Sequence, residues 1–330
     1  MSLKDALQHY LSVRDGIRDA RFLVASRTPA SFHGDSGISE LWMEHERIEA
    51  GMECSGACDR SFLDPKIEIA ERILGECSLC PWRCGVNRQM ESGRCGVMGP
   101  RVASEFLHYG EEAPLVPSHT VFFSGCTMRC VFCQNWDISQ NPSTGRHIEV
   151  DELAAIIEER RRMGAANVNF VGGDPTPALP YILRVLSVVS ISLPVVWNSN
   201  MYMSTESVRL IMGAADLYLT DFKFGNSECA ERLAGVHDYF EVVSRNHLMI
   251  AGEDMIIRHL VLPGHLECCT MPIISWVAEN LGTDTVMNIM GQYRPLYRAS
   301  AYPEINRPLY LEELEEARRW ALREGLENII

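Results

Sequence analysis

Ser124-Gly125-Cys126-Thr127-Met128-Arg129-Cys130-Val131-Phe132-Cys133-Gln134-Asn135-Trp136 carries three cysteines on one short segment, with the spacing C-x3-C-x2-C. An apolar run over residues 120–123 leads into the segment like a strand, and Gly125 ends that run. Three thiolates on one loop can hold three irons of a [4Fe–4S] cluster, and because such clusters normally take four cysteines, one iron stays open. Two other interpretations are a zinc loop with a distant fourth ligand and buried thiols that pack as small apolar side chains. Zinc loops more often pair their ligands as two C-x2-C units, which favours the cluster.

Composition narrows the class of protein. The chain has 330 residues, which is room for one large domain or two modest ones, and 46% of them are apolar. Twelve cysteines would suit a small secreted scaffold, but this chain is too long and its N-terminus lacks an apolar signal region. No apolar run approaches the roughly 20 residues of a membrane span. We therefore expect a cytosolic protein, and the net charge of −14 without a basic block argues against a nucleic-acid partner.

A second group of cysteines precedes the first. Cys77, Cys80, Cys84 and Cys95 follow the pattern C-x2-C-x3-C-x10-C, with little apolar sequence between them and with glycines that permit tight turns. This pattern predicts metal ligation rather than core packing. Zinc and iron–sulfur clusters both accept four thiolates, so the sequence leaves the metal open. A further pair, Cys54 and Cys58, offers additional ligands or, as the favoured interpretation, thiols without a metal role.

From about residue 118, apolar strand-like runs alternate with helical patterns. The six runs cover residues 120–123, 167–171, 195–197, 217–220, 256–262 and 285–290. Helical patterns include residues 151–163, 179–190 and 271–281. This alternation predicts parallel β/α units, and runs that are apolar on both faces suit strands buried between helices. Residues 1–53 have a helical and acidic character, another helix begins at Asp64-Pro65, and residues 311–326 form a last amphipathic helix.

Polar residues follow the apolar runs. Parallel β/α folds place their chemistry at the C-terminal ends of the strands, so these residues are expected to meet. Each is weak evidence alone, since Gly172-Gly173 is often only a turn and Asp221 with Lys223 suits a surface pair. Their shared location predicts one site. Its candidates are Gly172, Gly173 and Asp174 after the second run, Asn198 and Asn200 after the third, Asp221 and Lys223 after the fourth, and Arg258 with His259 in the fifth.

These features resemble the radical S-adenosylmethionine (SAM) enzymes, in the branch similar to pyruvate formate-lyase activating enzyme. The cysteine spacing, with an aromatic residue before the third cysteine, is similar to that family's signature, and the resemblance covers most of residues 77–306. It implies an α/β fold, a partial (β/α)6 barrel, with a [4Fe–4S] cluster on Cys126, Cys130 and Cys133 and SAM on the open iron. The expected organisation is a helical N-terminal extension (1–76), a Cys-rich metal-binding segment (77–117), the barrel (118–306) and a C-terminal helix (307–330).

The resemblance also implies which residues hold SAM. Lys223 would face the SAM carboxylate, which suits a compact ammonium charge. Asp174 departs from the family's usual Glu, which puts a direct side-chain role in doubt. The other implied contacts are Gly172 and Gly173 near the SAM amino group, Asn198 and Asn200 after the third strand, and Asp221 with His259 near the nucleoside.

The resemblance further implies the reaction. One electron from a reductant such as flavodoxin or ferredoxin would cleave SAM to methionine and a 5′-deoxyadenosyl radical, which removes a hydrogen atom from the substrate. Activating enzymes take that atom from a glycine of a partner protein, so we expect a protein or peptide substrate. One alternative is the same radical acting on a small molecule. Another is a non-catalytic iron–sulfur or zinc protein, although an electron carrier needs no nucleoside pocket.

The segment after the sixth run is the candidate for substrate recognition. It carries two Tyr-Arg pairs, Tyr293-Arg294 and Tyr297-Arg298, separated by Pro295. Tyrosine and arginine dominate binding hot spots, and arginine pairs bidentately with carboxylates. The alternative is that both arginines pair with acidic side chains and fix the connector.

Overall fold

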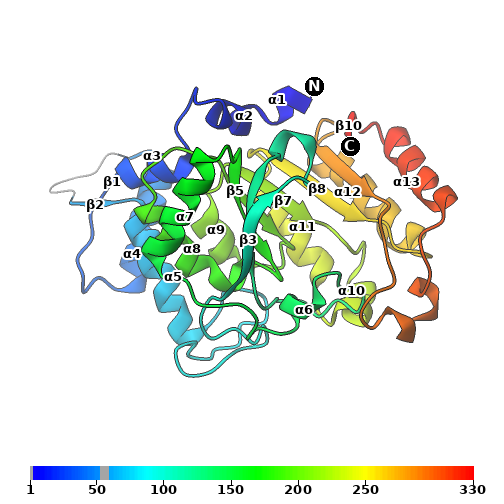
Figure 1. Ribbon diagram of the computed structural model, residues 1–330, viewed down its shortest axis with the longest axis horizontal. Helices are drawn as coiled ribbons and strands as arrows, with labels where there is room; N and C mark the ends of the chain where they lie inside the picture. The colour runs from blue at the N-terminus through cyan, green and yellow to red at the C-terminus, as the bar shows by residue number, and fades with distance from the viewer. Residues whose placement is uncertain (1–2, 53–58) are drawn as a thin grey trace.

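The computed structural model describes residues 3–52 and 59–330, so Cys54 and Cys58 lie outside the described part of the chain. Within that part, eight strands form one sheet in the order β10-β9-β8-β7-β6-β5-β4-β3 (Figure 1). The strands are β3 (Val102–His108), β4 (Ser118–Phe123), β5 (Asn167–Gly172), β6 (Val195–Ser199), β7 (Leu217–Asp221), β8 (Met255–Leu260), β9 (Val286–Met290) and β10 (Asn328–Ile329). Each strand from β4 to β9 pairs in parallel with the next, which confirms the six predicted strands and the α/β class.

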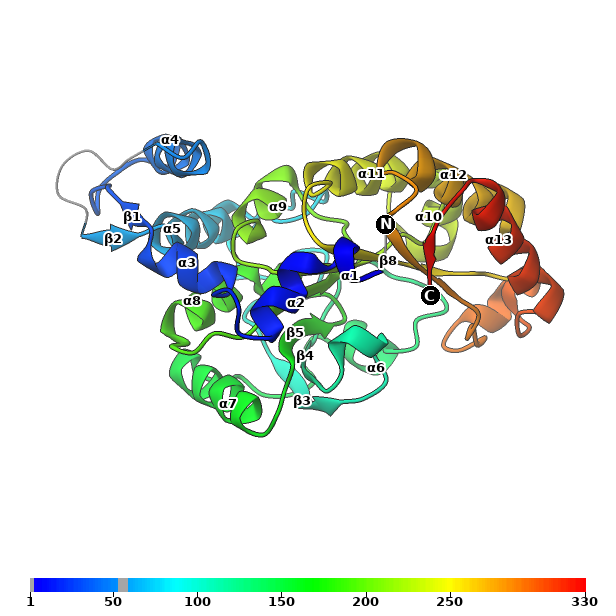
Figure 2. The same cartoon turned by 90° about the horizontal axis from the view of Figure 1, so that it is seen from above.

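Helices connect the parallel strands and follow an arc around the outside of the sheet (Figure 2). They confirm the predicted helical segments. Their bounds are α7 (Val150–Arg162), α8 (Leu179–Val188), α9 (Thr205–Ile211), α10 (Ser227–Ala234), α11 (Tyr239–Met249), α12 (Met271–Asn280) and α13 (Leu311–Arg323). Two further helices are α5 (Leu63–Ile73) and the short α6 (Trp136–Ser139), which follows the cysteine loop.

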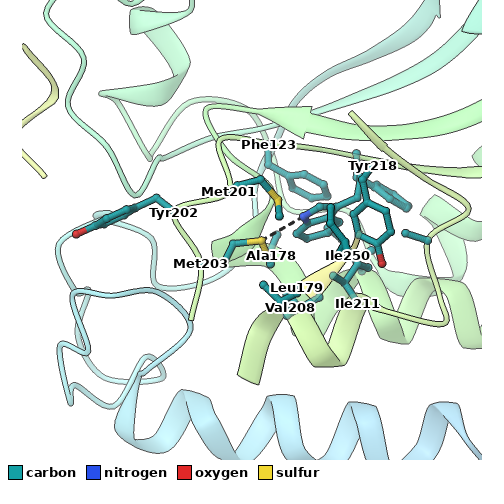
Figure 3. Close-up of a cluster of buried hydrophobic side chains, with 14 of the residues drawn as sticks. Phe123, Ala178, Leu179, Met201, Tyr202, Met203, Val208, Ile211, Tyr218 and Ile250 are labelled. Atoms are coloured by element: carbon teal, nitrogen blue, oxygen red, sulfur yellow. Dashed lines mark hydrogen bonds between the residues drawn. The ribbon is translucent and has the colours of Figure 1, made fainter. Parts of the chain in front are cut away.

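The outer face of the sheet packs against these helices. Phe123, Tyr218 and residues of α8 and α9 such as Leu179 and Val208 form a buried cluster (Figure 3). In the same cluster the indole Nε1 of Trp197 lies 3.4 Å from the sulfur of Met203. The inner face is apolar at the opposite end from the cysteine loop. There Val196, Leu219, Ile256 and Val286 form a separate buried cluster with Leu7 and Tyr10, which precede or belong to α2 (Gln8–Arg14).

The N-terminal region is helical, as predicted, and it packs on the barrel. Helix α2 closes the end of the sheet where the strands begin, and His9 Nε2 lies 2.8 Å from the Asp216 carboxylate just before β7. The remaining elements are α1 (Leu3–Ala6), α3 (Arg21–Arg27), α4 (Ile38–Glu49) and the small strand pair β1 (Pro29–Ala30) and β2 (Arg60–Ser61). Among the described helices, none is long and apolar enough to cross a membrane.

Two strands of the large sheet were not predicted. Strand β3 runs antiparallel to β4, and β10 adds two residues parallel to β9. The expected boundary at residue 118 therefore falls inside one sheet, because β3 belongs to the Cys-rich segment in sequence and to the barrel sheet in space. The two outermost strands, β3 and β10, do not pair with each other, so the barrel is partial, as predicted.

Candidate active site

One cavity lies at the C-terminal ends of the parallel strands. Its lining residues come from the loop after β4 and from the ends of β5, β6, β7, β8 and β9. Nine of the predicted cluster and SAM residues line it: Cys126, Cys130, Cys133, Gly172, Gly173, Asn198, Asn200, Asp221 and Lys223. The strand-end prediction thus brings together residues that are up to 97 positions apart in the sequence (223 − 126).

The cysteine loop is held in place by its backbone. Gly125 adopts φ +88°, a conformation that favours glycine, and turns the chain out of β4. The amides of Arg129 and Val131 donate to carbonyls at the end of α10, at 2.8 Å each. Cys126 and Cys130 are buried, and Cys133 is half-buried with its sulfur 3.2 Å from the hydroxyl of Ser139. Three thiols in the wall of one cavity fit a [4Fe–4S] cluster with one open iron.

Burial controls the protonation of these thiols. It raises the pKa of Cys126 well above the usual thiol value and that of Cys130 to about 12. Lys223 acts in the opposite direction on Cys130, but its charge does not outweigh burial. The thiols are therefore protonated without a metal and must release protons when they ligate iron.

Gly172 and Gly173 are required by the close approach of two backbones. Gly172 has φ +133°, and a Cβ there would lie 2.1 Å from the carbonyl oxygen of Phe123. A Cβ on Gly173 would lie 2.1 Å from the carbonyl oxygen of Gly125. The glycine pair thus packs directly on the base of the cysteine loop, and it lines the cavity through its backbone.

Asn200 connects the third strand end to the cysteine loop. Its side-chain amide donates to the hydroxyl of Thr127 at 3.1 Å and to the sulfur of Cys126 at 3.5 Å. A donor on a cysteine sulfur stabilises the thiolate form that ligates iron and tunes the metal centre. Asn198, two residues earlier on the same face of the strand, also lines the cavity.

Lys223 places a cation in the wall of the cavity. Its ammonium pairs with Asp221, two residues earlier. Burial alone would lower the pKa of Lys223, but the Asp221 carboxylate outweighs burial, so the net pKa is raised. Lys223 therefore remains charged at neutral pH.

The structure gives Asp174, for which a direct contact with SAM was in doubt, a place beside the cavity rather than in its wall. Asp174 is buried and does not line the cavity. Its carboxylate accepts hydrogen bonds from the Ser199 hydroxyl at 3.0 Å and from the amides of Thr176 and Asn200 at 3.2 Å. Burial raises its pKa to about 6. Asp174 fastens the end of β6 to the loop after β5, so it positions Asn200 rather than a ligand.

The structure does not bring His259 to the cavity either, and the reason is strand alternation. Successive side chains of β8 point to opposite faces, so Arg258 and Leu260 face the cavity while His259 faces the helices. Nδ1 of His259 lies 2.7 Å from the Phe222 carbonyl, and Nε2 lies 2.9 Å from the Thr270 hydroxyl. Both ring nitrogens are thus occupied within the protein. Burial lowers the pKa of His259 to about 4, so the ring is neutral.

Arg258, to which the family resemblance gave no role, is a charged residue of the cavity wall. It pairs with Glu111 and Glu112, which lie between β3 and β4, and its Nε donates to Glu112 at 2.7 Å. Burial opposes its charge, but Glu112 outweighs burial and the pKa of Arg258 is raised. The sequence could have indicated this direction, because Ile256, Arg258 and Leu260 stand two residues apart and so face the same side of the strand.

Some residues of the segment after β9 are buried and others are exposed. Tyr293 is buried, and its hydroxyl donates to the Ile305 carbonyl at 2.7 Å, so the structure does not place it on the surface where it was predicted to contact substrate. Tyr297 stacks on Trp136 with ring centroids 5.6 Å apart. Arg298 packs its guanidinium on the Tyr297 ring, and Arg294 is exposed. Within the described residues no ion pair joins either arginine to a carboxylate, so the structure lends no support to the alternative that they fix the connector.

The four N-terminal cysteines surround a second, smaller cavity. Cys77, Cys80, Cys84 and Cys95 all line it, together with Thr127 of the cysteine loop. The Arg94 amide donates to the Cys84 sulfur at 3.3 Å, and a Cβ on Gly93 would lie 2.9 Å from that sulfur. The Trp82 indole donates to the Thr127 carbonyl at 2.8 Å and joins the two cysteine regions. The structure thus brings together the four residues that the spacing predicted.

The chain is similar to known proteins over part or all of its length. The sequence model of the Radical SAM superfamily matches residues 120–277. The uncharacterised protein MJ0674 of Methanocaldococcus jannaschii is 45% identical over 336 residues, which cover 98% of this chain and 99% of that protein. Pyruvate formate-lyase 1-activating enzyme of Escherichia coli is 25% identical over 149 residues, covering 43% of this chain and 60% of that enzyme. The structure of Streptococcus suis SuiB bound to S-adenosylmethionine aligns with a TM-score of 0.47 and 15% identity, over 62% of this chain and 47% of that chain.

Proposed function

This chain belongs to the radical SAM superfamily, and from that membership we propose an enzyme of the activating type, which abstracts a hydrogen atom from a protein or peptide substrate. The observation that carries the proposal is one cavity lined by three cysteine sulfurs and a charged lysine. A [4Fe–4S] cluster and SAM, when bound there, supply reductive cleavage of SAM to a 5′-deoxyadenosyl radical.

Different residues of the cavity would bind the cluster and SAM. Cys126, Cys130 and Cys133 would hold the cluster, and Lys223 would hold the SAM carboxylate as a point charge. Asn198 and Asn200 present side-chain amides from β6 to the same cavity. Apolar side chains complete the wall and exclude water from a reactive radical. They are Met128, Phe132, Val171, Leu260 and Met290.

A polymeric substrate is favoured by the rim of the cavity. Gln134 and Asn135 line the cavity, and the next residue, Trp136, is 46% exposed and stacked on Tyr297. Arg298 is next to Tyr297 in the sequence and Arg294 lies three residues before it; both are exposed and have no carboxylate partner in the described part of the chain. Exposed aromatic and arginine side chains are the usual anchors of protein recognition. The likeness to an activating enzyme over 149 residues points in the same direction.

For the four-cysteine cavity we propose an auxiliary iron–sulfur cluster rather than zinc. A tetrahedral zinc ion with Zn–S bonds of about 2.3 Å would hold its sulfurs about 3.8 Å apart. No three of the sulfurs of Cys77, Cys80, Cys84 and Cys95 lie within 4.8 Å of one another. A cubane cluster spaces its ligands more widely than a single ion does. Contact with Thr127 would put this cluster beside the catalytic loop, where it suits electron entry from flavodoxin or ferredoxin.

Deuterium transfer tests the substrate class. An extract from source cells grown in deuterated medium would be separated by ultrafiltration into macromolecules and small molecules, and each fraction given to the reduced enzyme with unlabelled SAM. The proposal predicts deuterated 5′-deoxyadenosine with the macromolecular fraction, and loss of the label after protease treatment of that fraction. Label from the small-molecule fraction alone would establish the small-molecule alternative.

A further inference from the structure

A third group of metal-type side chains lies outside both cysteine cavities. It forms where α10 meets the π-helical turn Leu266–Thr270 that precedes α12. The sulfurs of Cys229 and Cys268 and a ring nitrogen of His265 all lie within 4.8 Å of one another. We propose that Cys229, His265 and Cys268 bind a single zinc ion, with the fourth position taken by Cys269 or by water.

The sulfur spacing fits one tetrahedral ion. Sγ of Cys229 lies 3.8 Å from Sγ of Cys268, and Sγ of Cys268 lies 3.9 Å from Sγ of Cys269. Zn–S bonds of about 2.3 Å in a tetrahedron place two sulfurs about 3.8 Å apart. Thiols in simple contact reach the same distance, so the spacing alone is not decisive. The imidazole beside them adds a ligand that a thiol pair does not require.

His265 is oriented as a ligand. Its Nδ1 lies 2.9 Å from the carbonyl oxygen of Pro263, and since a carbonyl only accepts, Nδ1 carries the proton. Nε2 is therefore left with a lone pair, as in metal-binding histidines whose other nitrogen donates to a carbonyl. His265 is 3% exposed, so this lone pair is shielded from water.

Arg232 competes with a metal ion for Nε2 of His265. Its guanidinium donates to Nε2 of His265 at 3.3 Å and also pairs with Glu304. Zinc binding would require Arg232 to release His265 and to keep its pair with Glu304. Two thiolates neutralise the ion, and Arg232 would offset a third thiolate from Cys269, which is buried. Mixed sulfur and imidazole ligands in a tetrahedron favour zinc over magnesium or calcium.

The site joins two connections that lead away from the active-site strands. The Asn226 side chain donates to the Cys268 carbonyl at 2.6 Å, and a Cβ on Gly225 would lie 2.7 Å from the Cys269 carbonyl. Gly225 and Asn226 continue from Lys223 into α10. A zinc ion here would thus fasten the segment after β7 to the segment after β8. The metal site itself does not depend on the reaction that the enzyme performs.

The test is zinc and iron analysis of the full-length, anaerobically purified and reconstituted protein after removal of loosely bound metal with a chelator. We expect about one zinc per chain, lost in Cys268→Ser and in His265→Ala with iron unchanged. Matched controls are His237→Ala, an exposed histidine, and Cys84→Ser in the second cavity, both of which should keep the zinc.

Zinc-edge X-ray absorption on the wild-type protein covers the case in which a variant does not fold. The expected shell has sulfur at about 2.3 Å and one nitrogen at about 2.0–2.1 Å. A shell of four sulfurs would place the zinc at another site and overturn the proposal. Zinc retained at full stoichiometry in both variants, or a metal-free chain with a Cys229–Cys268 disulfide, would overturn it as well.

Discussion

Lys223 and Asp221 form an ion pair at the end of β7, inside the wall that also holds Cys130. Both side chains project to the same face because they stand two residues apart in an extended segment. The pair keeps Lys223 charged against the cost of burial. It also means that an anionic ligand must share the ammonium with Asp221, so the affinity of the cavity for a carboxylate depends on a lysine that already has one partner.

Lys223→Ala should weaken SAM binding. A charge-assisted hydrogen bond contributes about 1.5–3 kcal/mol, so the dissociation constant should rise roughly ten- to hundredfold. Equilibrium binding of SAM to the reconstituted enzyme measures this directly. Lys4→Ala, an exposed lysine on α1, is the matched control and should leave the affinity unchanged. Wild-type affinity in Lys223→Ala would exclude Lys223 as a SAM ligand.

His259→Gln should keep SAM affinity within about twofold of wild type while lowering stability by about 1–3 kcal/mol, because hydrogen bonds to Phe222 and Thr270 are lost. The folded state holds His259 neutral down to about pH 4, whereas the unfolded histidine binds a proton below its ordinary pKa near 6.5.

Between those values the unfolded state binds more protons, so the contribution of His259 to stability falls as the pH falls. Unfolding curves at pH 7 and pH 5 should therefore show a smaller difference in the variant than in the wild type. A large loss of SAM affinity with unchanged stability would restore the ligand role that the sequence suggested.

The four-cysteine cavity should keep its metal when the barrel cluster is removed. In the triple variant Cys126→Ala/Cys130→Ala/Cys133→Ala we expect about four irons per chain, and adding Cys84→Ser should remove them. Iron and sulfide analysis with Mössbauer spectroscopy measures both. Zinc in place of iron, lost with Cys84→Ser, would identify a structural zinc site there instead.

Arg294→Ala and Arg298→Ala should separate substrate recognition from SAM chemistry. Both side chains are exposed, so each variant should keep its iron and its slow SAM cleavage without substrate. Turnover with the macromolecular fraction should fall about tenfold or more, the range of a binding hot spot. Arg323→Ala, an exposed arginine on α13, is the control. Joint loss of iron, solubility and uncoupled cleavage would show that the segment is structural.

The sequence predicted the parallel strands because their apolar runs are buried on both faces, and it predicted the cavity because strand ends meet. It could not place β3, where exposed or half-buried Ser104 and Glu105 interrupt the apolar pattern. It chose His259 over Arg258 because the family pattern names a residue type, whereas the pleat of β8 sets its direction.

The third metal-type group shows a different limit of sequence patterns. Cys229 and Cys268 are 39 positions apart, so no short motif joins them (268 − 229). They meet only because α10 and the turn before α12 follow neighbouring strands, β7 and β8. Tyr293 was predicted to lie on the surface for a related reason. Tyrosine is common at binding surfaces, but here its hydroxyl donates a hydrogen bond to the Ile305 carbonyl inside the protein.

The most direct measurement is the formation of 5′-deoxyadenosine from SAM by the anaerobically reconstituted, dithionite-reduced enzyme. The wild-type protein should form it, and Cys126→Ala, Cys130→Ala and Cys133→Ala should each abolish it. The fold, followed by circular dichroism, should persist, because each substitution removes one sulfur atom and leaves the packing of the strands and helices in place. No 5′-deoxyadenosine from a wild-type enzyme loaded with its full iron, or wild-type rates in any one of the three variants, would contradict the assignment of this cavity.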